Sequence, residues 1–191
     1  MLKLILASNS PRRKKILSDM NLNFEIIPSN YDEKLDNDIF YYEKIEDLAT
    51  QKCLDVVRRV GNDCVVLAAD TVVVLHNKIL GKPHTKENAY IMLKELSGQT
   101  HSVVTSICAI NTQLNRAATL STTSYVRFTP WTDEMIHYYI DKFAPLDKAG
   151  SYGIQELPPN YIDKFEGSFE NIVGLCPKAV QAILEQIRYH H

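Results

Sequence analysis

Cysteine and glycine are scarce in this chain, and neither residue type forms a recognisable motif. Only four cysteines and seven glycines occur among 191 residues, and no two cysteines are spaced as Cys-x-x-Cys. Scattered cysteines, mostly in apolar surroundings, argue against a disulfide framework or a zinc site and favour reduced thiols in a cytosolic protein. The glycine-rich phosphate-binding patterns GxxxxGKS/T and GxGxxG are absent as well.

Long apolar runs and a strong net charge are also lacking. No window approaches the roughly 18 apolar residues of a membrane span, and the short run Leu4–Ala7 continues into basic residues, unlike a signal peptide. The net charge of −2 creates no strong field for nucleic acid, and no aromatic–basic stripe occurs. We expect a cytoplasmic protein without a membrane or nucleic-acid partner, in which any phosphate binding comes from a local cluster of cations.

The apolar fraction of 45% and the charged fraction of 23% are ordinary for a globular protein. A chain of 191 residues can form one domain with a full core, or two lobes that share a cleft. Internal repeats and low-complexity segments are absent, and no linker divides the sequence. We therefore predict a single domain over residues 1–191.

Apolar periodicity and capping residues predict alternating strands and helices. The expected strands are Leu2–Ala7, Phe24–Pro28, Cys64–Ala69, Thr71–His76, Val103–Ile110, Ala117–Phe128 and Tyr161–Gly167. The expected helices are Pro11–Met20, Phe40–Val60, Thr85–Leu96, Thr132–Ile140 and a final helix that Pro177 opens. Because the helices interleave with strands while the middle reads as a hairpin, the pattern favours an α/β fold with a mixed sheet.

The first unusual site is the junction between the first strand and the first helix. Ser10 suits the N-cap and Pro11 the first helical position, yet the four cations of Arg12–Lys15 follow directly. The helix dipole favours anions at this end. The cations either form a solvated face or converge with backbone N–H groups on a phosphate chain.

A single carboxylate, Asp70, interrupts an apolar run of eleven residues over 65–75. Burying an unpaired carboxylate is costly, so this group needs a cation, a metal ion or water. Two readings remain open. Asp70 either sits exposed at a bend between two strands or lies at the floor of a cleft, where it ligates a divalent metal or activates water.

Lys52 is placed on the apolar stripe of the helix predicted over Phe40–Val60. The i, i+3, i+4 spacing puts it on the same face as Leu48, Ala49 and Val56. A cation at such a position either extends to the edge of the buried face or points into a site.

Three further signals are weak individually. Lys82 lies in a Gly-Lys-Pro turn, and a turn lysine is usually solvated. The small and polar segment over 147–155 is either a tight turn with an ion pair or a nucleotide-lining loop, in which Gln155 offers a donor and an acceptor to a base edge. Glu33 is either a surface residue or a second metal-binding carboxylate. Together with Arg13, Lys52 and Asp70, these residues suit metal-assisted hydrolysis of a nucleotide.

The chain resembles the Maf family of nucleoside triphosphate pyrophosphatases over nearly its whole length. The resemblance rests on five ordered blocks: LILASNSPRRKKIL, AADTVVV, GKPHTKENAYIMLKELSGQTHSVVTSICAI, DKAGSYGIQ and FEGSFENIVGL. It implies an extended mixed sheet flanked by helices, with two lobes around a central cleft, similar to the inosine triphosphate pyrophosphatase architecture. It also implies hydrolysis of a nucleoside triphosphate to the monophosphate and pyrophosphate, with Mg²⁺ or Mn²⁺ as cofactor, and a homodimer.

The resemblance also assigns roles to residues. The proton-accepting aspartate of the family falls on Asp70, and its acidic metal-site residue falls on Glu33. The phosphate-binding residues fall on Ser8, Arg13, Lys52 and Lys82. Family members that act on dTTP and UTP share the residues found here as Arg12, Thr71 and Gln155, whereas the 7-methyl-GTP group differs at the first two of these positions.

Four positions depart from the family pattern, namely Ala144, Glu156, Cys176 and Cys53. The family usually has glutamate at the position of Ala144 and glycine at that of Glu156. Two other functions remain open: a nucleotide-binding regulator of septum formation and cell division with little turnover, and a 7-methyl-GTP pyrophosphatase.

Overall fold

The computed structural model describes residues 2–31 and 39–189. The strands are β1 (Lys3–Leu6), β2 (Phe24–Ile26), β3 (Cys64–Leu75), β4 (Lys78–Leu80), β5 (Thr100–Asn111), β6 (Arg116–Phe128) and β7 (Ile162–Glu166). The α-helices are α1 (Pro11–Asp19), α2 (Tyr42–Val60), α3 (Lys86–Leu96), α4 (Asp133–Phe143), α5 (Phe169–Val173) and α6 (Pro177–Gln186). Three short 3₁₀ turns cover Ala149–Ser151, Ile154–Glu156 and Pro159–Tyr161.

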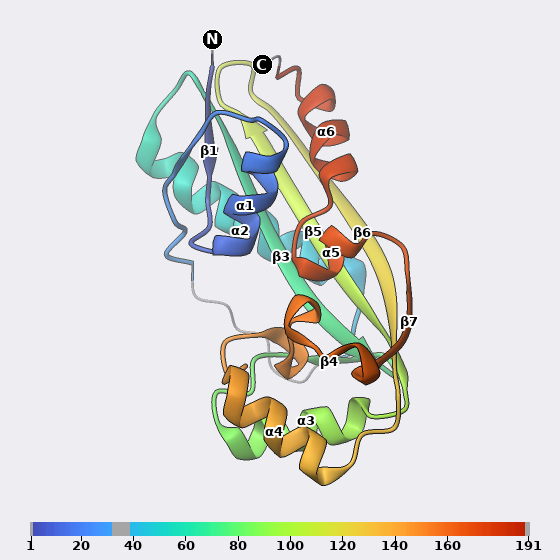
Figure 1. The fold of residues 1–191 in the computed structure, drawn as a ribbon. Helices are drawn as coiled ribbons and strands as arrows, with labels where there is room; N and C mark the ends of the chain where they lie inside the picture. The colour runs from blue at the N-terminus through green and yellow to red at the C-terminus, as the bar shows by residue number, and fades with distance from the viewer. Residues whose placement is uncertain (1, 32–38, 190–191) are drawn as a thin grey trace.

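The described strands form one mixed, seven-stranded sheet in the order β2-β1-β3-β5-β6-β7, with β4 beside the last part of β3. β1 is parallel to β2 and β3, whereas β3, β5, β6 and β7 are successive antiparallel neighbours. The long strands β3, β5 and β6 connect an upper lobe, which carries both termini, to a lower lobe that contains α3 and α4 (Figure 1). This confirms the expected α/β fold with an extended mixed sheet and two lobes.

Alternating residues of β3 contribute to separate cores on the two faces of the sheet. Val65 and Leu67 pack with α1 and α6, whereas Val66 and Ala68 pack with α2. A third core fills the lower lobe, where Phe128 stacks on Trp131 with ring centroids 4.5 Å apart. None of the helices within residues 2–31 and 39–189 has the length and apolar character that a membrane span requires.

The prediction of two strands separated at Asp70 is wrong, because β3 continues without a break from Cys64 to Leu75. β5 pairs with one edge of β3 throughout, while the other edge pairs first with β1 through Leu67 and later with β4 from Val73. Between these two partners, no strand of the described chain pairs with this second edge of β3 at residues 68–72. This gap leaves room for a cleft against the middle of β3.

Some boundaries differ from the sequence prediction. Helix α2 begins at Tyr42 instead of Phe40, and α4 continues to Phe143 instead of ending at Ile140. The short helix α5 was not predicted at all. Residues 32–38, which include the candidate site residue Glu33, lie outside the described residues.

A buried histidine links the sheet to the cleft wall and makes stability depend on pH. The Nε2 atom of His101, on β5, lies 2.7 Å from the Tyr152 hydroxyl oxygen. Burial lowers the pKa of His101 to about 3. In the unfolded chain the imidazole binds a proton near pH 6.5, so acid favours unfolding as the pH falls from about 6.5 to about 3. We expect this residue to lower the free energy of unfolding by about 2 kcal/mol between pH 7 and pH 5.

Urea denaturation of the wild type and of His101→Gln at pH 7 and pH 5 measures this contribution. The variant is expected to lose the part of the pH dependence that comes from the imidazole. An equal change in free energy for both proteins between the two pH values would contradict the assignment.

Candidate active site

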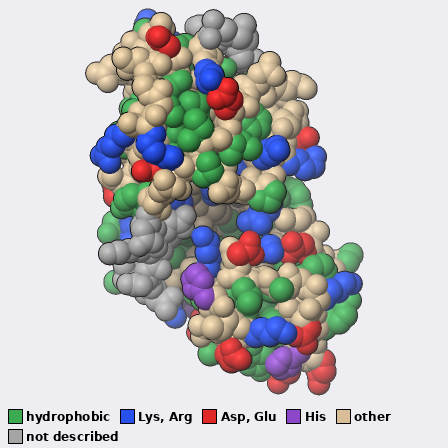
Figure 2. Space-filling view, turned by 90° about the vertical axis from the view of Figure 1, so that its left-hand side faces the viewer, with side chains coloured by type: hydrophobic (Ala, Val, Ile, Leu, Met, Phe, Trp, Pro, Cys, Tyr) green, Lys and Arg blue, Asp and Glu red, His purple; other side chains and the backbone are tan. Residues whose placement is uncertain are grey.

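A cleft of about 450 Å³ lies against the unpaired edge of β3. Several parts of the chain line it, among them the loop and first turn over 7–13, Lys52 of α2, the segment over 147–155 and the segment over 172–174. Figure 2 shows the surface hollowed between the two lobes, with Lys and Arg side chains around the hollow. The cleft therefore gathers the sequence blocks that were widely separated along the chain.

Asp70 lies on the floor of this cleft and contacts Lys52. Strand periodicity directs Asp70 to the same face of β3 as Ala68 and Val72, which is the face that α2 covers. Lys52 Nζ forms an ion pair with Asp70 Oδ1, and both residues are buried, at 6% and 3% exposed. A buried ammonium next to a carboxylate favours the ionised carboxylate. The reading of Asp70 as an exposed residue at a bend is wrong, and so is the reading of Lys52 as a cation that extends to the edge of the buried face.

Arg13 is held by three acceptors from three parts of the fold. Its Nε donates to the Gly174 carbonyl at 3.0 Å, Nη2 to Thr71 Oγ1 at 3.0 Å and Nη1 to Ser8 Oγ at 3.3 Å. Ser10 caps α1 by accepting from the Arg13 backbone N–H, which fixes where the side chain begins. The guanidinium is therefore preorganised at the cleft wall.

A second layer of hydrogen bonds fixes the partners of Arg13. Thr71 Oγ1 lies 3.0 Å from Thr105 Oγ1, and Thr105 donates to the Asn171 carbonyl at 3.2 Å. Asn171 is fully buried and donates through Nδ2 to the Val103 carbonyl at 3.1 Å. The unpredicted helix α5 thus carries the residues that place Gly174 against Arg13.

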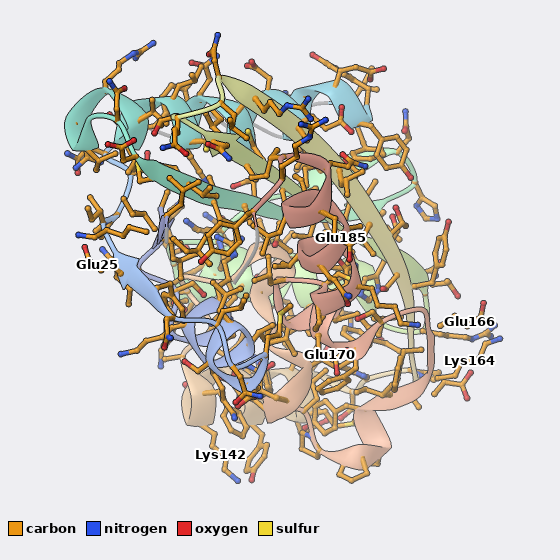
Figure 3. The ribbon with its side chains drawn as sticks, turned by 90° about the horizontal axis from the view of Figure 1, so that it is seen from above. Glu25, Lys142, Lys164, Glu166, Glu170 and Glu185 are labelled. Atoms are coloured by element: carbon orange, nitrogen blue, oxygen red, sulfur yellow. The ribbon has the colours of Figure 1, made fainter. Side chains whose placement is uncertain are left out.

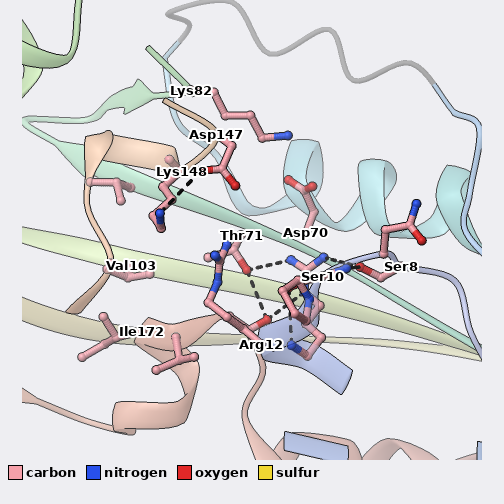
Figure 4. A pocket seen from close by; sticks show the side chains of 18 of the residues that line it. Ser8, Ser10, Arg12, Asp70, Thr71, Lys82, Val103, Asp147, Lys148 and Ile172 are labelled. Atoms are coloured by element: carbon pink, nitrogen blue, oxygen red, sulfur yellow. Dashed lines mark hydrogen bonds and ion pairs between the residues drawn. The ribbon is translucent and has the colours of Figure 1, made fainter. Parts of the chain in front are cut away.

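The remaining predicted residues are distributed around the same cleft. Ser8, Arg12, Lys82 and Gln155 all line it, together with Arg13, Lys52, Asp70 and Thr71. In Figure 4, Lys82 extends from its wall toward Asp70. Glu33 lies outside the described residues, so its place in the site stays a prediction.

The donors present suit a metal ion that also binds the substrate. In the part of the chain that the structure describes, no group of three or more His, Cys, Asp or Glu side chains forms a metal cage. Mg²⁺ is typically held by one or two carboxylates together with substrate phosphates. Asp70, surrounded by cations that suit phosphates, fits this mode of binding.

Sequence reasoning missed Lys148 as an individual site residue. Lys148 lines the cleft, is only 9% exposed, and lies 3.5 Å from Asp147 Oδ1 and 3.4 Å from Glu156 Oε1. The turn that carries Lys148 depends on Gly150, which has a φ of +65°. Gly150 also packs closely against Val73, because a Cβ atom added to Gly150 would lie 2.8 Å from the Val73 side chain. The sequence signal was the Asp-Lys pair at the start of the 147–155 segment.

Two departures from the family pattern lie away from the catalytic floor. Ala144 ends α4 in the left-handed conformation, with its N–H donating to the Ile140 carbonyl at 2.9 Å, and it does not line the cleft. Cys176 precedes the first residue of α6 and is buried.

Comparison with known proteins agrees with this arrangement. A family model described as Maf-like protein matches residues 3–187. The dTTP/UTP pyrophosphatase of Caldicellulosiruptor saccharolyticus is 38% identical over 192 residues, which cover 99% of this chain and 96% of that protein. The dTTP/UTP pyrophosphatase of Clostridium perfringens strain SM101 is 40% identical over 187 residues, which cover 96% of each chain.

A solved structure shares the fold. The crystal structure of a nucleoside-triphosphatase / dITP/XTP pyrophosphatase from Mycobacterium abscessus matches with a TM-score of 0.50 and 14% identity, covering 98% of this chain and 95% of that one. At this identity the likeness concerns the fold alone, and it agrees with the expected fold class. The family model and the two relatives each span nearly the whole sequence, so the chain belongs to the family of Maf-like proteins.

Proposed function

We propose that this protein hydrolyses dTTP and UTP to the monophosphate and pyrophosphate, as a house-cleaning enzyme. The names of the two relatives support the substrate. The observation that carries the proposal is the buried Asp70, which contacts Lys52 in a cleft that Arg13 and Lys82 also line. A carboxylate surrounded by cations suits a polyphosphate substrate, because the cations stabilise negative charge while the carboxylate accepts a proton.

In the proposed mechanism, Asp70 accepts a proton from the water that attacks the α-phosphorus. Lys52 favours the ionised form of Asp70 and also faces the substrate. The cations Arg13 and Lys82 bind the phosphate chain and stabilise the charge that develops on the pyrophosphate as it leaves. Ser8, which already accepts a hydrogen bond from Arg13, adds a hydroxyl at the same wall.

Mg²⁺ or Mn²⁺ is the proposed cofactor. Asp70 would hold it together with substrate phosphates, and Glu33 is the predicted second carboxylate. When bound, the ion neutralises charge on the phosphate chain and so assists departure of pyrophosphate.

Arg12, Thr71 and Gln155 are the proposed specificity residues for pyrimidine nucleotides. Gln155 is exposed in the cleft, and its amide offers one donor and one acceptor to a base edge. Thr71 acts on the same side of the site as Arg13, because its hydroxyl accepts from the guanidinium at 3.0 Å.

Pyrophosphate release from a panel of nucleoside triphosphates with Mg²⁺ or Mn²⁺ tests the function. We expect turnover of dTTP and UTP well above that of ATP, GTP and 7-methyl-GTP. Faster turnover of 7-methyl-GTP would support the alternative pyrophosphatase. Binding without release of pyrophosphate from any nucleotide would support the regulator of septum formation.

A homodimer and a cytoplasmic location are also proposed. Two aromatic side chains, Phe165 and Phe169, lie with ring centroids 5.8 Å apart and are 45% and 39% exposed, which suits a protein interface. Light scattering after gel filtration tests the dimer. All four cysteines are free and buried, which agrees with a reducing compartment.

A further inference from the structure

Lys148 is a nearly buried cation at the cleft wall, and two carboxylates hold its ammonium in place. Nζ lies 3.5 Å from Asp147 Oδ1 and 3.4 Å from Glu156 Oε1. The aliphatic part of the Lys148 side chain packs against Gly153. A Cβ atom added to Gly153 would lie only 3.3 Å from Lys148 Cε. A lysine side chain has many rotamers, so this packing and pairing fix the ammonium at one place on the wall.

Lys148 lies at the end of the cleft to which two aliphatic side chains, Val103 and Ile172, contribute. Ser8, Ser10 and Asp70 lie toward one end in Figure 4, whereas Lys148, Val103 and Ile172 lie toward the other. Hydroxyls and the carboxylate suit the phosphate chain, while aliphatic side chains suit the flat faces of a base. The base of a bound nucleotide would therefore be the part of the substrate that meets Lys148.

The hydrogen-bonding edge of uracil and thymine requires two donors and one acceptor from the protein, because it presents O2, N3–H and O4. Gln155, next to Glu156 in the chain, supplies one donor and one acceptor, but its amide can rotate to suit cytosine equally well. A lysine ammonium has donors only. A lysine facing position 4 therefore accepts a carbonyl oxygen and rejects the amino group of cytosine.

We propose that Lys148 is a further specificity-determining residue, whose ammonium donates to O4 of uracil or thymine and excludes cytosine. The proposal rests on the proposed hydrolysis of dTTP and UTP. In this proposal, the Lys148 ammonium makes the enzyme prefer UTP and dTTP over CTP. The Gln155 amide alone would not give this preference, because it can rotate to suit either base.

Glu156 is a positioning residue for Lys148 in the same proposal. Its Oε1 pairs with Lys148, while its Oε2 accepts from the Tyr139 hydroxyl at 3.2 Å. The Tyr139 oxygen in turn accepts from the Gly153 N–H at 3.0 Å. One carboxylate thus ties the ammonium to the backbone two residues before Gln155. The family usually has glycine at the position of Glu156. A glycine has no carboxylate to pair with Lys148, so this contact is specific to chains with glutamate here.

The test compares the wild type with Lys148→Met, which removes the charge and keeps an unbranched apolar stem. The ratio of kcat/KM for UTP to that for CTP is expected to fall by about tenfold or more, since one charge-assisted hydrogen bond is lost. An unchanged ratio would overturn the proposal. An equal loss for UTP, CTP and ATP would also overturn it, because it would indicate a contact with phosphate.

Glu156→Gln provides a second variant, since it keeps an acceptor for Tyr139 but removes the charge that holds Lys148. We expect a higher KM for UTP with kcat retained, and a smaller fall in the UTP/CTP ratio than Lys148→Met gives. No change in KM or in the ratio would overturn the role of Glu156. The thermal midpoint and circular dichroism spectrum of each variant report whether the fold is intact.

Lys164→Met is the matched control. Lys164 pairs with Glu166 at 3.1 Å, is 59% exposed and lies at the rim of the molecule in Figure 3, so its loss should not change the ratio. A change in the control equal to that in Lys148→Met would overturn the proposal.

Calorimetric binding of UTP and CTP analogues with a methylene bridge between the α- and β-phosphorus gives the same comparison without turnover. If the wild type releases no pyrophosphate, the proposed function fails. In that case, a preference for the UTP analogue over the CTP analogue that is tenfold lower in Lys148→Met than in the wild type would still support the role of Lys148.

Discussion

Asp70→Asn is expected to lower kcat for UTP by about 10³-fold, within the range for loss of a general base. The asparagine amide has nearly the same size but accepts no proton from water, so the loss falls on the chemical step. The fold should persist, because β3 keeps its strand partners β1, β4 and β5. Pyrophosphate release under saturating UTP measures kcat, and circular dichroism checks the fold.

The variant also removes the negative charge that the buried Lys52 ammonium contacts. Breaking a buried ion pair from one side typically costs about 3 kcal/mol or more, so urea denaturation should show a lower free energy of unfolding. Adding Lys52→Met should restore part of that stability and none of the activity. Asp141→Asn is the matched control, since Asp141 is 68% exposed and pairs with Lys86 on the surface. Near-normal turnover by Asp70→Asn would refute its catalytic assignment.

Arg13→Lys is expected to lower kcat/KM by about 100-fold for every triphosphate that the enzyme accepts. The coplanar N–H groups of the Arg13 guanidinium donate to the Gly174 carbonyl, Thr71 Oγ1 and Ser8 Oγ. A lysine keeps the charge but cannot reproduce this fork, and transition-state contacts of this kind contribute about 3 kcal/mol. Initial rates with UTP and dTTP at low substrate concentration give the ratio.

The control for this change is Arg127→Lys, because Arg127 is about half exposed and pairs with Asp163 at 3.2 Å outside the cleft. It should retain wild-type kcat/KM. A loss in Arg13→Lys that is confined to one base would contradict a phosphate-binding role, and so would a loss below twofold.

Much of the fold was predictable because the elements carry strong local signals. Thr85 and Thr132 cap α3 and α4 as predicted, and Pro177 opens α6. The hairpin of β5 and β6 was also predicted from its alternating pattern. The single strand β3 was not, because a charged residue in an apolar run resembles a turn until its partner is known. Lys52 comes from 18 residues earlier in the chain.

The site was predictable as a set of residue types but not as a geometry. The position of Lys52 on the apolar stripe of its helix allowed either an extension to the edge of the buried face or a direction into a site, and only the fold shows that it points to Asp70. The five-residue helix α5 is too short to give a periodic pattern, so the role of Gly174 in holding Arg13 had no local signal. Lys148 was hidden because its partner Glu156 lies across a turn that Gly150 makes possible.

The most direct test of the central claim is hydrolysis of UTP by the wild type in water enriched in ¹⁸O, with the products analysed by mass spectrometry. The mechanism predicts UMP that carries one ¹⁸O atom and pyrophosphate that carries none, because water attacks the α-phosphorus beside Asp70. Label in pyrophosphate, or formation of UDP and inorganic phosphate, would contradict it.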